Sequence, residues 1–130
     1  MLEDAARARA TEACHLASGG YMSGALYLAG YVVECKLKLL LSKMGKPYPN
    51  AGKPGHDLKT LWDTAGLRRD DQGGFRRAFL EYWSTDLRYS GLVSSEHAPE
   101  DLLRGAQELA GYVTKRTTSI RGIVRRRVRR

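Results

Sequence analysis

Residues 21–44, YMSGALYLAGYVVECKLKLLLSKM, give the clearest indication of how this chain folds. Its apolar side chains recur at steps of three and four, a spacing that predicts a helix inside a bundle. One stripe consists of Tyr21, Ala25, Leu28, Val32, Cys35 and Leu39. A second stripe consists of Leu26, Ala29, Val33, Leu37 and Leu40. Because two faces of this helix are apolar, we expect it to be central and buried on most sides.

Four other segments have helical spacing, and they are residues 2–18, 58–65, 71–84 and 99–126. Glycines and the proline-rich segment 45–56 separate them, and such residues favour loops. The chain has no Asn-Gly or Asp-Gly dipeptide and no clear two-residue alternation, so it gives little signal for strands. The sequence therefore predicts an all-α fold, an up-and-down helical bundle of four main helices plus a short extra helix. It is expected to be a single domain over residues 1–130.

The composition favours a cytoplasmic protein. Cys14 and Cys35 both lie in helical sequence, so we expect free, buried thiols in a reducing compartment. Residues 1–4 are acidic and lack the apolar run of a secretory signal. The longest apolar stretch, residues 25–33, is too short to cross a bilayer, so no transmembrane segment is expected.

The net charge of +8 is concentrated in a basic C-terminal extension, residues 115–130. This extension holds eight of the 22 basic side chains and no acid, which leaves 14 basic against 14 acidic groups elsewhere. The arginines expected to bind phosphate or a partner are Arg121, Arg125, Arg126, Arg127, Arg129 and Arg130. A basic helix of this kind could grip phosphates, lie on an anionic membrane surface, pair with an acidic partner, or simply remain solvated.

A charged stripe interrupts the apolar helix, since Glu34 and Lys38 lie four residues apart and Tyr31 lies one turn earlier. Such charges must be paired or reach water. They could form a substrate-binding surface, with Lys38 meeting phosphate, tyrosines stacking a base and His56 acting as acid or base. Alternatively, Glu34 and Lys38 form a structural ion pair with His56 or Arg88. Both interpretations stay open at this point.

Several segments together resemble a known family. Residues 28–40 look like a second-helix signature, His56-Asp57-Leu58 follows a proline-rich loop, and Trp83 precedes Leu87-Arg88-Tyr89-Ser90. In order and spacing these segments resemble the bacterial and archaeal HEPN domains over roughly residues 3–115. The resemblance implies a helical bundle that is usually a homodimer. It also implies nucleotide binding, RNA cleavage or a role in toxin–antitoxin and defence systems, in many members beside a minimal nucleotidyltransferase partner.

Arg88 and His97 are the candidate catalytic pair. Metal-free RNA cleavage needs a base for the 2′-hydroxyl and a cation for the phosphorane charge, and His with Arg supplies both. Ribonucleases of the family separate the two by four to six residues, whereas eight residues separate them here. Either the motif is stretched across a loop, or this chain is not a ribonuclease of the usual type.

The sequence predicts no metal site and no cofactor. The side chains Cys14, His15, Cys35 and His56 do not form the close pairs that zinc sites show. The glycine pairs lack the spacing of a phosphate-binding loop. From the resemblance, the predicted function is RNA or nucleotide binding, and whether the chain also cleaves RNA without a metal stays open at this point. The alternative is a non-catalytic interaction module that partners a minimal nucleotidyltransferase.

Overall fold

A computed structural model of the chain describes residues 1–49, 56–83 and 97–129, and side chains up to residue 120. The elements are α1 (Leu2–Ser18), α2 (Met22–Met44), α4 (Leu58–Thr64), a 3-10 turn η1 (Arg69–Asp71), α5 (Gly74–Tyr82) and α6 (Pro99–Arg129). No strand occurs in the described part of the chain. The all-α helical bundle predicted from the sequence is confirmed.

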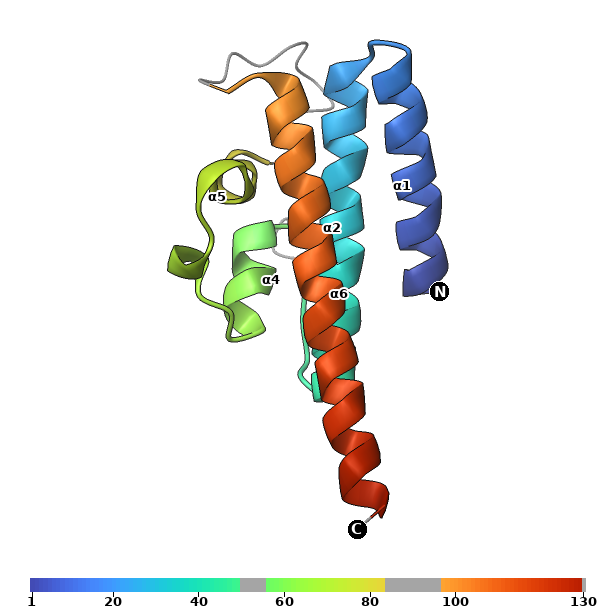
Figure 1. The fold of residues 1–130 in the computed structure, drawn as a ribbon, viewed down its shortest axis with the longest axis vertical. Coiled ribbons are helices and arrows are strands. Elements are labelled where there is room, and N and C mark those ends of the chain that lie inside the picture. The colour runs from blue at the N-terminus through green and yellow to red at the C-terminus, as the bar shows by residue number, and fades with distance from the viewer. Residues whose placement is uncertain (50–55, 84–96, 130) are drawn as a thin grey trace.

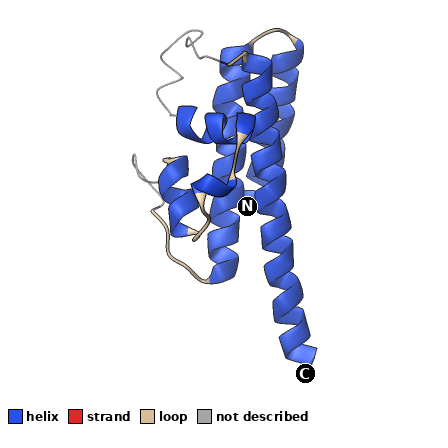
Figure 2. Cartoon of the chain, turned by 60° about the vertical axis from the view of Figure 1, so that its left-hand side comes forward, coloured by secondary structure: helices blue, strands red, loops and turns tan. Residues whose placement is uncertain are grey.

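Three long helices form the frame of the molecule. α1 runs antiparallel to α2, and α6 runs in the same direction as α2 (Figure 1). α1 packs on α2, while α6 packs on both α2 and α5. The short helices α4 and α5 lie on the other side of this frame and complete the bundle (Figure 2). The central position predicted for residues 21–44 is therefore the position that α2 occupies.

The core forms where α2 meets α4, α5 and α6. Leu37 of α2, Trp62 of α4 and Phe79 of α5 are each fully buried, as is Leu109 of α6. The predicted α2 stripe that contains Val33, Leu37 and Leu40 is buried throughout. The other predicted stripe wrongly includes Tyr21. This residue precedes α2, and it is 68% exposed.

Helix ends follow the local chemistry of the chain. The side chain of Asp57 accepts a hydrogen bond from the Lys59 backbone N–H, so Asp57 caps α4. Gly45 ends α2 in the left-handed conformation, at φ 69°, which glycine adopts without strain. The predicted helix 71–84 is shorter than expected, because η1 and Gly73 precede its start at Gly74.

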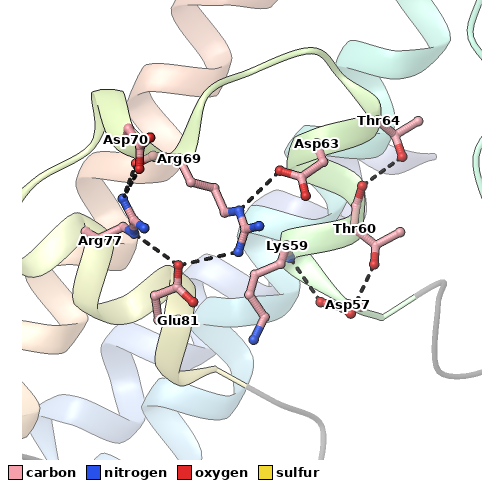
Figure 3. Close-up of polar contacts among 9 residues, drawn as sticks. All are labelled: Asp57, Lys59, Thr60, Asp63, Thr64, Arg69, Asp70, Arg77 and Glu81. Atoms are coloured by element: carbon pink, nitrogen blue, oxygen red, sulfur yellow. Dashed lines mark hydrogen bonds and ion pairs between the residues drawn. The ribbon is translucent and has the colours of Figure 1, made fainter.

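A surface network of ion pairs holds η1 against α4 and α5 (Figure 3). Arg69 lies 3.2 Å from the Asp63 carboxylate and 3.5 Å from that of Glu81. Arg77 contacts Asp70 at 3.2 Å and Glu81 at 3.0 Å. The guanidinium of Arg77 also donates to the Arg69 carbonyl at 2.9 Å. These bonds fix a short segment that has few apolar side chains of its own.

The two cysteines differ, which corrects the prediction that both are buried. Both thiols are free, but Cys14 is exposed and only Cys35 is buried. Ala6 and Ala13 of α1 are buried, whereas Cys14 lies one position further round the helix, where its side chain is exposed. Burial raises the pKa of the Cys35 thiol, so this group stays protonated at neutral pH.

Candidate functional site

A buried charged cluster, formed by Glu34, Lys38 and His56, lies where α2 meets the start of α4. Lys38 Nζ lies 3.1 Å from Glu34 Oε2, and His56 Nδ1 lies 2.9 Å from Glu34 Oε1. Each oxygen of the Glu34 carboxylate therefore has a partner. The side chains of Glu34 and Lys38 are each only 6% exposed, whereas that of His56 is 35% exposed. The cluster thus reaches the surface through the imidazole.

Local structure explains why these three side chains meet. Glu34 and Lys38 are one helical turn apart, so they share one stripe of α2. His56 stands directly before Asp57, the residue that caps α4. Because α4 packs against α2 through the core, its start brings the imidazole onto the charged stripe.

Aromatic rings surround the charged cluster. The ring of Tyr31 makes edge contacts with the rings of Tyr27, His56 and Trp83, at centroid distances of 5.1, 5.8 and 5.6 Å. The hydroxyls of Tyr27 and Tyr31 are 3.1 Å apart. Lys38 Nζ lies 6.0 Å from the centroid of the Tyr48 ring. The arrangement combines ring faces and edges with charged and hydrogen-bonding groups.

Gly30 allows Trp83 to lie directly on the backbone of α2. A Cβ at Gly30 would come within 1.8 Å of the indole ring, so no side chain fits there. The indole Nε1 donates a 3.1 Å hydrogen bond to the Tyr27 carbonyl. Sequence reasoning missed this contact and the position of Tyr48. A glycine in the middle of an apolar helix was the available signal, because it weakens a helix unless something packs against it.

All four predicted substrate-binding residues come together in the structure. Tyr31, Glu34, Lys38 and His56 form one continuous group through the contacts given above. The ion pair offered as the structural alternative is formed, with His56 as the partner. Chemically, the group holds a buried carboxylate neutralised by an ammonium, beside an imidazole that reaches the surface.

The structure describes only one residue of the predicted catalytic pair. Arg88 lies outside the described residues. His97 is exposed just before α6, and its ring centroid lies 5.8 Å from that of Phe75 on α5. The pairing of Arg88 with His97 therefore stays a prediction.

The basic extension continues α6 without a break. The helix runs from Pro99 to Arg129, and its last turns extend beyond the other helices (Figure 1). Lys115 and Arg116, where the extension begins, are exposed. The backbone is helical at Arg121, Arg125, Arg126, Arg127 and Arg129, while Arg130 lies outside the described residues.

A groove with both apolar and charged side chains in its lining lies on the opposite side of α2, between α1 and α6. It consists of two cavities of about 330 and 310 Å³ that share Ala10, Val32, Lys36 and Thr114. Most of the remaining lining is small, with alanines of α1 on one wall and Ala106, Ala110 and Gly111 of α6 on the other. The first cavity also has Glu3, Arg7 and Lys36 in its lining, whereas the lining of the second is mainly apolar.

Among the residues that the structure describes, no group of three or more His, Cys, Asp or Glu side chains could hold a metal ion. Within the same residues, no helix is long and apolar enough to cross a membrane.

Comparison with known proteins gives no match to a family model, to a curated protein or to a solved structure.

Proposed function

We propose that this protein binds RNA or a nucleotide, with the basic end of α6 as the element that holds phosphate. The observation that carries the proposal is the course of α6. It is one helix of 31 residues whose end lies beyond the other helices and carries the excess charge of the chain (Figure 1). The rest of the chain, called the body from here on, has balanced charge. A basic helix end that extends beyond this body can follow a phosphate backbone without steric conflict.

Charge distribution supports this proposal over a uniformly basic surface. The 14 basic and 14 acidic groups outside the extension balance each other. Many of the body's arginines are already paired, as in the network of Arg69 and Arg77. Phosphate binding would then fall steeply with salt, because each neutralised phosphate releases counterions.

The HEPN resemblance extends the proposal to a class of protein. In this interpretation the bundle is a cytoplasmic homodimer and a toxin–antitoxin or defence component. Tyr31 and His56 would contact the bound RNA or nucleotide beside the buried Glu34 and Lys38, and Arg88 with His97 would form a site for metal-free cleavage.

A second candidate is a non-catalytic module that partners a minimal nucleotidyltransferase. The pairing of Glu34 with both Lys38 and His56 favours it, because these groups are already satisfied within the fold. In that case the cluster fixes the packing of α4 on α2, and the surface of the bundle meets the partner.

Binding is tested by fluorescence anisotropy of a labelled single-stranded RNA with the full chain over a range of salt. In the test variant, four extension arginines become glutamine: Arg121, Arg125, Arg126 and Arg127. In the matched control, four exposed basic residues of the body become glutamine: Arg7, Lys43, Arg68 and Arg104. We expect the test variant to lose most affinity and most of the salt dependence. Wild-type affinity in the test variant would contradict the proposal.

Cleavage is tested on the same RNA with EDTA present, comparing the wild type with Arg88→Ala and His97→Ala. Loss of cleavage in both variants would support the predicted pair. Binding without cleavage by the wild type would favour the non-catalytic module.

A further inference from the structure

We propose that the groove between α1 and α6 binds a small aliphatic carboxylate, with Lys36 as the residue that meets its carboxylate group. The proposal does not depend on RNA binding, because it concerns the side of α2 opposite to the buried charged cluster. It is carried by a half-buried lysine that lines both cavities and has no counter-charge among the described residues.

Small side chains make the groove hollow. α1 and α6 both pack on α2, so α2 is the floor of the groove and the other two helices are its walls. Ala10 and Ala13 line the α1 wall, and Ala106 and Ala110 line the α6 wall. The cavities measure about 330 and 310 Å³. Sites for small molecules range from about 300 to 1,000 Å³, so the groove is large enough for a ligand of modest size.

Lys36 is the free positive charge of this groove. Within the described part of the chain, its ammonium makes no hydrogen bond and no ion pair. The other charged groups of the first cavity have partners, since Arg7 lies 3.7 Å from the Asp4 carboxylate and Glu3 is not free either. Half-burial removes part of the hydration of the Lys36 ammonium without an anion to compensate for it. An anionic ligand group beside Lys36 would supply a charge-assisted hydrogen bond.

The second cavity suits the apolar part of such a ligand. Its lining is mainly apolar and runs along α6 from Leu103 to Thr114, which is about 16 Å at the rise of an α-helix. The described lining of both cavities contains no aromatic side chain, so the groove lacks the stacking surfaces that a nucleobase uses. An alkyl chain needs only apolar contact. The chain would therefore lie in the second cavity with its carboxylate at Lys36.

The position of the free charge favours a narrow ligand over a protein helix. Lys36 belongs to α2, the floor of the groove, and not to either wall. A ligand that pairs with it must enter between α1 and α6. A carboxylate on an alkyl chain is narrow enough, whereas a helix with its side chains is about 10 Å across.

Isothermal titration calorimetry of the full chain with decanoate, below its micelle concentration, tests the proposal. Decanol has the same chain without the charge, and decyltrimethylammonium reverses the charge. We expect decanoate to bind saturably as a single molecule. Its affinity should exceed that of octanoate by up to about fourfold for each added methylene, the usual gain from burying a CH₂ group. Decyltrimethylammonium is expected to bind about tenfold more weakly or worse, since it cannot pair with an ammonium.

Two variants with matched controls locate the site. Lys36→Met keeps an apolar side chain without the ammonium, so it should weaken decanoate binding about tenfold or more and leave decanol binding unchanged. Lys43→Met, at an exposed lysine of α2 outside the groove, should bind decanoate like the wild type. Ala10→Leu, at a position that both cavities share, should weaken binding of both ligands by filling the groove. Ala8→Leu, at an exposed alanine of α1 outside the groove, is its control.

The proposal is overturned by a wild type that does not bind decanoate saturably, by equal affinities for decanoate and decyltrimethylammonium, or by wild-type decanoate affinity in Lys36→Met. Sedimentation of the same samples identifies the competing occupant. Self-association that Ala10→Leu abolishes, in a wild type that does not bind decanoate, would assign the groove to a second copy of the chain and overturn the proposal.

Discussion

Two of the groups of ion pairs in the described part of the chain, the buried charged cluster and the surface network, differ in their surroundings. In the buried charged cluster, Glu34 and Lys38 have side chains 6% exposed. In the surface network around Arg77, every side chain is at least 35% exposed. Bond lengths are similar, between 2.9 and 3.5 Å in both groups. Geometry alone therefore does not say what each group contributes to stability.

Burial, and not the number of contacts, sets the free-energy cost of losing an ion-pair partner. Water compensates a surface charge whose partner is removed, so exposed pairs contribute little individually. A buried charge left without its partner has no such compensation. We therefore expect the cluster with two bonds to matter more than the network with five.

Glu34→Ala is expected to have the largest effect of the changes considered. It leaves the Lys38 ammonium buried without its counter-charge, which typically costs about 3–5 kcal/mol of unfolding free energy. Urea denaturation measures the loss. Adding Lys38→Met to Glu34→Ala is expected to recover part of the stability, because the second change removes the unpaired charge. A loss below about 1 kcal/mol in Glu34→Ala would show that burial does not set the cost of losing this partner.

Gly30→Ala tests the wall of the cluster without changing any charge. The new Cβ would fall within 1.8 Å of the Trp83 ring and force it away from α2. Overpacking of this kind typically costs about 1–3 kcal/mol, again measured in urea. The matched control is Gly111→Ala in α6, where a Cβ meets nothing within 4 Å. It is expected to stabilise the protein by about 0.5–1 kcal/mol, since alanine favours a helix.

Arg77→Ala tests the hub of the surface network. It removes contacts to Asp70, Glu81 and the Arg69 carbonyl. We expect a small fall in the thermal midpoint that shrinks further in 1 M salt, because exposed pairs are screened. A fall as large as that of Glu34→Ala would mean that contact number outweighs burial.

Glu12→Gln is expected to have the smallest effect. The hydrogen bond from Arg9 lowers the pKa of the Glu12 carboxyl in the folded protein. Such a group adds stability above the carboxyl's ordinary pKa and loses it as the pH falls through the lowered value. The thermal midpoints of wild type and Glu12→Gln should therefore differ slightly at neutral pH and converge in acid. A difference that grows in acid would have the wrong sign.

Helix positions were predictable from the sequence, because breakers and periodicity are local signals. The predicted bounds 2–18 and 58–65 lie within one residue of α1 and α4. The pairing of Glu34 with His56 was one of two partners considered, since a buried carboxylate needs a cation or donor but the sequence does not say which. The contact of Trp83 with Gly30 could not be predicted, because it joins residues 53 positions apart through the packing of whole helices.

The basic residues in the last turns of α6 affect the stability of the helix itself. A helix carries partial negative charge at its carboxyl end, so arginines there stabilise the helix that bears them. Arginines four residues apart, such as Arg121 and Arg125, repel each other and oppose it. A bound polyanion would remove the repulsion and leave the dipole interaction in place. The last turns of α6 would then be more stable as a helix when phosphate is bound.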